Sequence, residues 1–509
     1  QAYESRASRG ERVIGLAYMN DSISDEQCSV QWLKENKLPL VFAGFVSMQD
    51  PPKDGVIEAV QQCRTAQVQV VMVTGDHHLT AVAIAKQIGI ITDEVDEFID
   101  KADQIELQVE EPEPQSCYVK DKQKFLIDRL SKTSDSFLPD QRQLGAVITG
   151  DYLSSASDDQ LLCLVMNYKE LVFARTTPQQ KLQIVKAFQK LEKYVAVTGD
   201  GLNDAPALKQ ANVGVAMASG SDIAKDAANI VLVNDSFALI VDGIQQGRLI
   251  FDNLKKAMSF SISTAIPEVI PFLLFVICGF PSCLSSILLV LIDLAACIWP
   301  SFAMAYEAPE SDIMKKPPRS RRDKMFSGQL CWNAYGKLGL FQALNLVLVF
   351  MATVMKEVYR LTNTWMPLGI FIDMEHKDFA TIRLRDYLLK YFDQANADKV
   401  AINIYYTGQT AGFISIVITQ FAHALIGRTR LQSIFNSKVN WRLVLAIVMI
   451  FVMAAIFCYI PVLHKILSTV NLNVEYWLYS LPAAGFMFVE DELRKLSLRT
   501  CFKNNQKAH

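Results

Sequence analysis

The sequence lacks an excess of charge of either sign. Its 50 Lys and Arg residues against 53 Asp and Glu residues give a net charge of −3, so no global positive field indicates binding to nucleic acid. The ten cysteines include no CxxC pair and no Cys/His spacing typical of zinc ligands. We therefore expect reduced or buried thiols rather than a disulfide framework or a zinc site.

The sequence also lacks an initiating methionine and a visible signal peptide, since it begins at Gln1. We therefore expect a fragment whose upstream part is missing. Hydrophobic residues make up 51% of the 509 residues and charged residues 20%. That balance is too apolar for an ordinary soluble protein and too charged for a purely membrane one. The soluble and the membrane-like parts of the sequence follow one another. Residues 1–250 are typical of a soluble α/β protein, and residues 255–490 carry long apolar runs.

Six stretches in the second half are long and apolar enough to span a bilayer of about 30 Å. They lie near residues 256–278, 284–305, 333–356, 402–426, 440–460 and 473–490, and the fourth is the most polar. Lys and Arg gather at 248–256, 315–324, 428–430 and 494–499. Because basic segments stay on the cytoplasmic side, we expect a multi-pass protein of the lipid bilayer with both ends in the cytoplasm.

Two carboxylates lie inside the first two apolar stretches. Glu268 follows Pro267 in the first, and Asp293 lies in the middle of the second. A proline frees a backbone carbonyl, and an ionisable group in hydrocarbon is costly, so both features favour an ion path inside the bundle. The alternative is a pair of buried, protonated groups that hydrogen-bond to neighbouring helices.

Short apolar strands alternate with helical patterns over residues 40–250. The predicted strands are 67–73, 144–148, 171–174, 194–197, 213–217 and 230–233, and helices are predicted at 80–90 and 179–191. This alternation is typical of a doubly wound, mainly parallel sheet. Ligands bind such sheets beyond the carboxyl ends of the strands.

Residues suited to a magnesium–phosphate site lie at those strand ends. They are Thr74-Gly75-Asp76, the run TGDGLNDAPAL that begins at Thr198, and Lys181 near the start of a helix. Carboxylates bind the hard cation, lysine and backbone amides offset phosphate charge, and glycine lets the backbone approach closely. Each piece alone is weak, because Gly and Asp at strand ends usually just form turns. A third triplet, Thr149-Gly150-Asp151, is read as such a turn.

Longer segments around these residues resemble the P-type cation-transporting ATPases, most closely the sodium/potassium and proton/potassium pump α-subunits. The matching segments are VMVTGDHHLTAVAIA (71–85), FARTTPQQKLQIV (173–185), VTGDGLNDAPALKQANVGVAM (197–217), GRLIFDNLKKAM (247–258) and AYEAPESDIMKKPPR (305–319). The resemblance covers roughly residues 10–500. It implies a dehalogenase-like α/β domain followed by a six-helix transmembrane bundle.

The resemblance also implies domains and roles. Residues 1–40 would be a remnant of the nucleotide-binding domain, 41–250 the C-terminal part of the phosphorylation domain, and 251–509 the transmembrane domain. In the family, catalysis and nucleotide binding would involve Thr74, Gly75, Asp76 and Lys181, with Arg12 reaching the nucleotide phosphates. Asp200 and Asp204, beside Asn203, would hold Mg²⁺, and Thr264, Glu268 and Asp293 would line the cation path. The implied cofactors are Mg²⁺ and ATP, and the implied cargo is Na⁺, K⁺ or H⁺.

Several family features are absent or altered. The DKTGT motif, with the aspartate that accepts phosphate, is missing, so we expect the chain alone not to complete a pump cycle. At the expected ion site Ala265, Cys297 and His423 replace an asparagine and two carboxylates. Fewer carboxylates should weaken the binding of hard cations. The loop at 357–401 has no clear match to the β-subunit contact motif, although a β-type subunit is an expected possible partner.

Three functions are therefore considered. The first is an ATP-driven monovalent-cation pump of the sodium/potassium type, in the plasma membrane, that cycles through an aspartyl phosphate in the complete protein. The second is a non-pumping relative whose degenerate ion site leaves it a membrane scaffold or signalling partner. The third is a soluble dehalogenase-like phosphatase, against which the six apolar stretches argue strongly.

Overall fold

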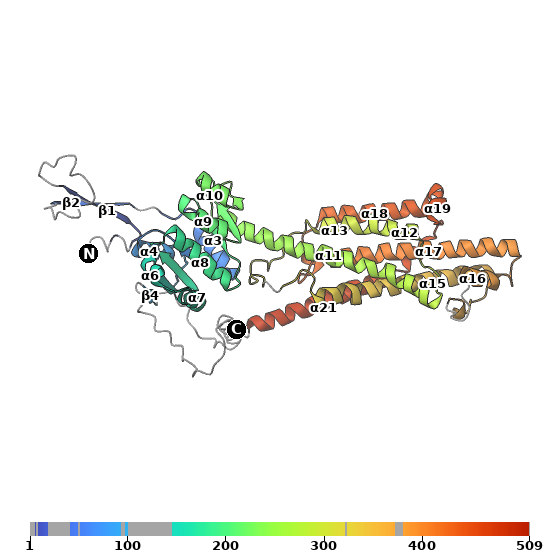
Figure 1. The fold of residues 1–509 in the computed structure, drawn as a ribbon. Coiled ribbons are helices and arrows are strands. Elements are labelled where there is room, and N and C mark those ends of the chain that lie inside the picture. Colours follow the sequence, from blue (N-terminus) through green and yellow to red (C-terminus); the bar gives the residue numbers. More distant parts are fainter. Residues whose placement is uncertain are drawn as a thin grey trace, which may run out of the picture. The chain divides into compact units, whose positions relative to one another are not determined.

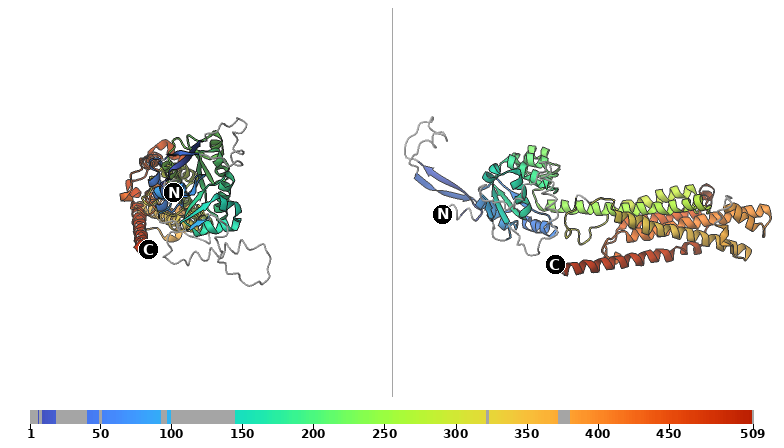
Figure 2. Two further views of the ribbon diagram at one scale, coloured as in Figure 1. Left: turned by 90° about the vertical axis from the view of Figure 1, so that its left-hand side faces the viewer. Right: turned by 60° about the horizontal axis from the view of Figure 1, so that its bottom comes forward.

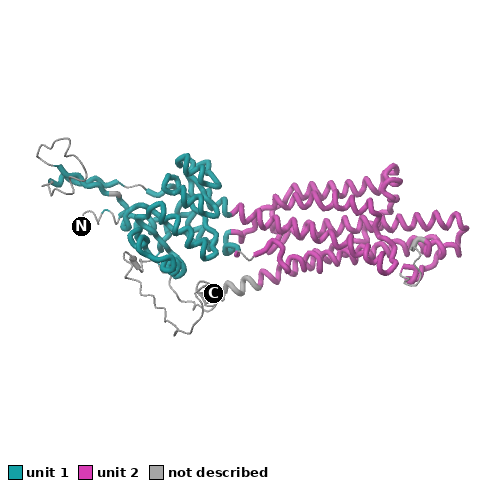
Figure 3. Tube along the Cα trace, in the orientation of Figure 1, with its two compact units in different colours: residues 1–244, 314–319 teal, residues 245–313, 320–509 magenta. Residues whose placement is uncertain are grey.

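The protein is described by a computed structural model that covers residues 6, 9–18, 41–48, 51–92, 97–99, 145–320, 323–371 and 380–507. The chain divides into two compact units (Figure 3). Unit 1 comprises residues 1–244 and 314–319, and unit 2 comprises residues 245–313 and 320–509.

Unit 1 contains a four-stranded parallel sheet with the order β3-β6-β5-β4. Its strands are β3 (Val71–Val73), β6 (Glu170–Ala174), β5 (Gly145–Thr149) and β4 (Glu97–Ile99). Every residue of β5 and β6 is buried, as expected for central strands covered on both faces. The helices of this region are α3 (Val56–Thr65), α4 (His78–Gln87), α6 (Gly150–Ser155), α7 (Asp158–Asn167) and α8 (Pro178–Lys190).

A second parallel sheet of three strands has the order β7-β8-β9. It consists of β7 (Ala196–Gly199), β8 (Val213–Ala216) and β9 (Ile230–Val231), with η3 (Leu202–Asp204), α9 (Ala205–Gln210) and α10 (Asp222–Ala227) between the strands. The single sheet predicted from the sequence is thus two sheets. Among the described strands, none of the first sheet pairs with a strand of the second.

An antiparallel pair, β1 (Arg12–Tyr18) and β2 (Val41–Met48), lies near the N-terminus of unit 1. The register shifts between Leu16 and Ala17, which marks a β-bulge. Apolar side chains on both strands are exposed, for example Leu16 at 50% and Phe42 at 67%.

The regular elements in the described part of unit 2 are helices, and the long ones run side by side (Figures 1 and 2). The first, α11 (Ala238–Cys278), begins in unit 1 and contains Pro267 and Pro271. A second run consists of α12 (Ser286–Leu291), the π-helix η4 (Ile292–Cys297) and α13 (Ile298–Met304). The others are α14 (Gly328–Cys331), η5 (Trp332–Gly339), α15 (Leu340–Thr362), α16 (Ala380–Leu388), α17 (Gln394–Ile426), α18 (Trp441–Tyr459), α19 (Pro461–Leu467), α20 (Val474–Leu478) and α21 (Leu481–Lys507).

Five of these helical runs are long and apolar enough to cross a membrane, within the described part of the chain. They are Ala238–Cys278, Ser286–Met304, Gly328–Thr362, Gln394–Ile426 and Trp441–Tyr459. The sixth predicted stretch, 473–490, is not among them. It is divided between α20 and α21 by the turn at Tyr479 and Ser480, and α21 continues into a strongly charged segment.

The most polar predicted span, α17, lies at the centre of the bundle. Its apolar window is 89% buried inside the protein, against 28–50% for the other four. Its polar side chains find partners there, since Tyr405 Oη and Gln409 Nε2 both donate to the carbonyl of Ser282, at 2.8 and 3.0 Å. Polar residues in this helix therefore serve contacts between helices.

Candidate functional site

The first polar group of interest lies beyond the carboxyl end of β7 in unit 1. Lys181 Nζ lies 2.6 Å from Asp204 Oδ1, and the two side chains are only 16% and 17% exposed. Asp204 also accepts a hydrogen bond from the Gly201 backbone N–H through Oδ2, at 3.3 Å. Lysine, carboxylate and glycine amide thus converge on one position.

Local sequence fixes each member of this group. Lys181 lies in the first turn of α8, which Thr177 caps and Pro178 opens. The Gln180 side chain donates to the carbonyl of Gly150 at 2.7 Å and so ties the same turn to the end of β5. On the opposite side, a Cβ at Gly199 would lie 2.6 Å from the Cβ of Asp204, so only glycine leaves that carboxylate in place.

Asp200 and Asn203 follow β7 but do not join the ion pair. Both side chains are exposed, and Lys181 pairs with Asp204 and not with Asp200 in the described structure. The backbone at Asp200 is fixed, because its carbonyl accepts a hydrogen bond from Ser221 N at 2.8 Å. The two predicted magnesium carboxylates therefore differ in environment, one accessible to solvent and one partly buried.

A second group joins the ends of β3 and β6. The Thr74 carbonyl accepts hydrogen bonds from the Thr176 backbone N–H and hydroxyl, both at 3.0 Å. Arg175 N donates to the Asp76 carbonyl at 3.0 Å, and Thr74 Oγ1 accepts from Asp76 N at 3.1 Å. Gly75, between them, is exposed with open space around it. The predicted Thr74–Asp76 loop is thus held by the loop that leads into α8.

The third triplet, Thr149-Gly150-Asp151, was expected to form a plain turn, but it begins the helix α6 directly after β5. Thr149 Oγ1 caps α6 by accepting from Tyr152 N at 3.4 Å. Gly150 is buried, and a Cβ there would lie 2.1 Å from the carbonyl oxygen of Arg175. This glycine serves packing between strand ends.

Arg12, predicted to reach a nucleotide, is the first residue of β1 and pairs with Met48 through the backbone. Its side chain lies outside the described part of the chain.

A polar cluster in unit 2 brings together residues from three helices. The carboxyl groups of Glu268, on α11, and Asp293, on η4, interact with each other. Cys297, on η4, interacts with both carboxylates and with the hydroxyl of Thr264, on α11. Gln420, on α17, donates from Nε2 to Cys297 Sγ at 3.8 Å. Thr264 and Gln420 are each 3% exposed.

Irregular helix geometry positions these side chains. Pro267 and Pro271 flank Glu268 within α11, where each removes a backbone hydrogen bond. Asp293 and Cys297 both lie in a π-helix, a form that is rare and frequent at functional sites. Glu268 is half-buried, Cys297 is 8% exposed, and Asp293 is exposed on the helix surface.

His423 does not join this cluster through its own ring. Its Nδ1 lies 2.9 Å from Ser263 Oγ, and its ring centroid lies 5.1 Å from that of Phe260. Ser263 is fully buried and His423 is 2% exposed. Ala265, the third altered position, is exposed. The histidine therefore cross-links α11 and α17.

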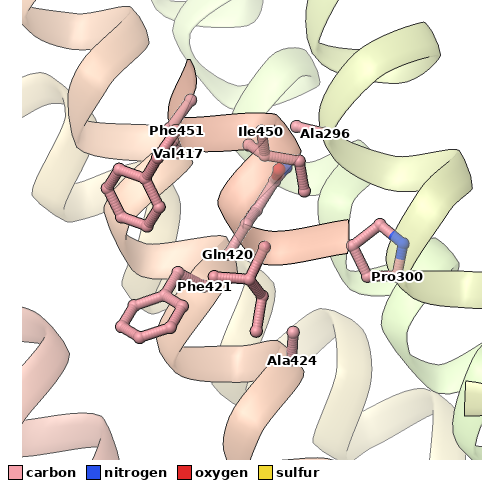
Figure 4. Close-up of a pocket in the computed structure, with 9 residues that line it drawn as sticks. Ala296, Pro300, Val417, Gln420, Phe421, Ala424, Ile450 and Phe451 are labelled. Carbon is pink, nitrogen blue, oxygen red and sulfur yellow. The ribbon is translucent and has the colours of Figure 1, made fainter. Parts of the chain in front are cut away.

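Sequence reasoning missed two members of these groups, Ser263 and Gln420. Both are polar residues in apolar stretches, one next to Thr264 and one three residues before His423. Polar side chains in apolar helices usually face a neighbouring helix, so this pattern could have indicated both residues as contacts between helices. Figure 4 shows the Gln420 side chain extending from α17 toward Ala296 of η4. Among the described residues, no group of three or more His, Cys, Asp or Glu side chains is arranged to hold a metal ion.

Comparison with known proteins identifies both units. Residues 281–497 match the family model for the C-terminus of cation-transporting ATPases, and residues 17–118 and 181–240 match models of haloacid dehalogenase-like hydrolases. The chain is 37% identical over 98% of its length to sodium/potassium-transporting ATPase subunit alpha-4 of Rattus norvegicus. It is 39% identical over 90% of its length to the Drosophila melanogaster sodium/potassium-transporting ATPase subunit alpha.

A third relative is the potassium-transporting ATPase alpha chain 2 of Oryctolagus cuniculus, 37% identical over 98% of this chain. The chain spans about half the length of these relatives, 46%, 41% and 43% respectively. The matches extend across the dehalogenase-like sheets and the helical bundle alike. The chain therefore carries the C-terminal region of a cation-transporting ATPase together with haloacid dehalogenase-like segments.

Proposed function

We propose that this chain supplies the phosphate-handling and cation-carrying parts of an ATP-driven monovalent-cation pump of the sodium/potassium type. The observation that carries this proposal is the Lys181–Asp204 pair, 2.6 Å apart beyond the end of β7. A partly buried lysine beside a carboxylate and glycine amides is suited to a phosphoryl group held with a metal ion.

The residues at this position fit Mg²⁺ and ATP phosphates. Mg²⁺ is usually held by one or two carboxylates together with water and phosphate oxygens, and Asp200 and Asp204 would supply two carboxylates. When bound, the metal neutralises charge on the phosphoryl group. Lys181 would offset further phosphate charge, and Thr74 and Asp76 would lie along the adjoining loop. The phosphorylated aspartate would come from the DKTGT segment that this sequence lacks.

The polar cluster of Thr264, Glu268 and Asp293 would carry the cation. Carboxylates inside apolar helices are typical of ion paths, and Pro267 frees a backbone carbonyl next to Glu268. We further propose six membrane crossings, a location in the plasma membrane, and cytoplasmic ends. A β-type subunit is a proposed partner whose contact would involve the segment 357–401.

Phosphoenzyme formation tests the pump function. In the protein that contains this chain, we expect Mg²⁺-dependent labelling from radioactive ATP that responds to Na⁺ or K⁺. Lys181→Ala should lower the labelling rate by about 10²–10³, the usual effect of removing one charge-stabilising donor. Lys190→Ala, also on α8 but 45% exposed, is the matched control and should leave the rate unchanged. Absence of phosphoenzyme with every cation would exclude the pump.

A second candidate is a non-pumping relative that acts as a membrane scaffold or signalling partner. The observation that favours it is the hydrogen bond between His423 and Ser263. The resemblance implies a carboxylate at position 423, but His423 instead links two helices there. In that case the protein would assemble with partners while forming no phosphoenzyme.

A further inference from the structure

The backbone of Asp200, one of the two proposed magnesium carboxylates, contacts the loop of residues 217–221, which connects β8 to α10. The Asp200 carbonyl accepts a hydrogen bond from the Ser221 backbone N–H at 2.8 Å. Gly220 is buried, and a Cβ there would lie 3.3 Å from the Asp200 Cα and 3.2 Å from its carbonyl oxygen. The loop therefore packs closely against Asp200, and glycine makes this approach possible.

Asp235 holds the same loop through a hydrogen bond to its side chain. This residue lies in the short segment between β9 and α11, and its Oδ1 accepts from the Ser219 backbone N–H at 3.0 Å. The N–H of Gly220 donates to the Met217 carbonyl at 3.0 Å, which closes the loop into a turn. Three consecutive residues, 219 to 221, thus join the Asp235 carboxylate to the Asp200 backbone.

The Asp235 side chain is an ionised acceptor at neutral pH. Hydrogen bonds from Ser219 and the ammonium of Lys53 hold the pKa of its carboxyl below the ordinary value of 3.8. Hydrogen bonds to a charged group are roughly twice as strong as those between neutral groups. Lys53 Nζ lies 3.7 Å from Asp235 Oδ2, but its side chain is 63% exposed, so this ion pair contributes little. The bond from Ser219 is therefore the contact through which Asp235 fixes the loop.

We propose that Asp235 is a positioning residue for the magnesium site. It holds residues 219–221 in place, and these hold the Asp200 backbone where its exposed carboxylate can bind Mg²⁺. The proposal rests on the proposed function, which assigns Asp200 to the metal, and adds a residue that lies outside the predicted site. Side chains that orient a metal-binding carboxylate typically change metal affinity by about 10–100-fold.

Binding of Mn²⁺ to the full chain in detergent, followed by electron paramagnetic resonance, tests the proposal without enzymatic activity. Mn²⁺ accepts the same carboxylate ligands as Mg²⁺. Asp235→Ala should weaken Mn²⁺ binding about tenfold. Asp235→Asn should recover most of the affinity, because its amide oxygen can still accept the hydrogen bond from Ser219. Wild-type affinity in Asp235→Ala would overturn the proposal.

Two control variants assign the effect to the hydrogen bond. Asp226→Ala removes an exposed carboxylate from α10, with the same change in charge, and should leave Mn²⁺ affinity unchanged. Lys53→Met removes the ion pair and should weaken binding about twofold at most. If Lys53→Met weakened binding as much as Asp235→Ala, the ion pair and not the Ser219 contact would carry the effect, and the proposal would be wrong.

Hydrogen exchange gives a second readout that needs no bound metal. Asp235→Ala should speed exchange of the Ser219 and Ser221 amides while β5 and β6 stay protected, which shows that the fold is intact. Unchanged exchange at Ser221 would contradict the proposal. Asp200→Asn distinguishes failure of the proposed function. If this variant binds Mn²⁺ like the wild type, Asp200 is not a metal ligand. If it loses binding while Asp235→Ala does not, only the positioning role is refuted.

Discussion

Gly75 and Gly150 occupy the same position in two Thr-Gly-Asp triplets, and their surroundings differ. A Cβ at Gly150 would lie 2.1 Å from a backbone carbonyl, whereas Gly75 has open space around it. We expect Gly150→Ala to lower the free energy of unfolding by about 1–3 kcal/mol through overpacking. Gly75→Ala should change it by no more than about 0.5 kcal/mol. Thermal unfolding of the two variants checks this.

The same two substitutions also distinguish an effect on packing from an effect on phosphate binding. Gly75→Ala should weaken phosphate binding at the adjoining loop while the protein stays folded, because backbone approach matters there. If Gly75→Ala proved as destabilising as Gly150→Ala, the assignment of the exposed triplet to a binding site would lose its support.

Glu310, in the loop after α13, gives a prediction on pH. Burial raises the pKa of its carboxyl, but the Lys256 ammonium, 3.2 Å away, and the backbone N–H groups of Arg430 and Leu431 outweigh this and hold the pKa below its ordinary value of 4.5. A lowered folded-state pKa stabilises the fold above about pH 4.5, and that contribution is lost as the pH falls through the lower folded value.

Replacement of this carboxylate should remove the effect. Glu310→Gln should destabilise unit 2 by about 1.5–3 kcal/mol at neutral pH, the range for hydrogen bonds to a charged group. The difference from the wild type should shrink in acid below pH 4.5. Unfolding curves across pH in detergent measure both quantities, and a difference that stays constant with pH would contradict the assignment.

Residue identity alone predicted part of the site. Lys181 and Asp204 were expected together because motifs at the ends of parallel strands meet at one sheet edge, and they form an ion pair. The Ser263–His423 contact was not expected, because it joins residues 160 positions apart and depends on how α11 packs against α17. Helix periodicity specifies which face of a helix is polar, but not which neighbour that face meets.

At the scale of elements, a buried ion pair joins the loop after α13 to the loop after α17. Arg428 Nη2 lies 2.9 Å from Glu307 Oε1, and the two side chains are 8% and 4% exposed. Asn440 Nδ2, just before α18, donates to Glu307 Oε2 at 2.9 Å, and Asn253 Nδ2, on α11, donates to the Glu307 carbonyl. Four segments of the bundle thus converge on one glutamate.

Glu307→Leu should therefore be severely destabilising. It would leave the Arg428 guanidinium buried without a counter-charge, which costs about 3–5 kcal/mol. The double variant Glu307→Leu/Arg428→Met should recover most of that loss, since it removes both charges. Unfolding of the detergent-solubilised protein measures the two values. If the double variant were less stable than either single variant, the two side chains would stabilise the fold by more than the neutralisation of each other's charge.

The elements themselves were predicted unevenly. Strands β3 and β5 to β9 were expected within a few residues, as were α4 and α8, whereas β1, β2 and β4 were not predicted. The separation into two sheets was not expected, because sequence alternation does not reveal which strands pair. The π-helix at Ile292–Cys297 was also missed, since its residues are compatible with an ordinary helix.

At the scale of the whole chain, hydrogen bonds and ion pairs assign the loops of unit 2 to two ends of the bundle. At one end, Lys495 Nζ donates to the Ile426 carbonyl at 3.0 Å, and Glu492 Oε1 accepts from Ile434 N at 3.1 Å. At the other end, Lys356 pairs with Glu475 at 2.8 Å. The segment from 475 to 492 therefore traverses the bundle, although a turn interrupts it between α20 and α21.

This path supports six crossings, and labelling can test it. In sealed vesicles with the cell exterior outward, a membrane-impermeant thiol reagent should label Trp365→Cys and Val462→Cys, at positions 64% and 74% exposed. Phe326→Cys and Phe435→Cys, at positions 54% and 79% exposed, should be labelled only after the membrane is permeabilised. Because the exposures are comparable, differences in labelling report the side of the membrane. Labelling of Phe435→Cys in intact vesicles would contradict the orientation, and a C-terminal tag accessible from outside would reduce the crossings to five.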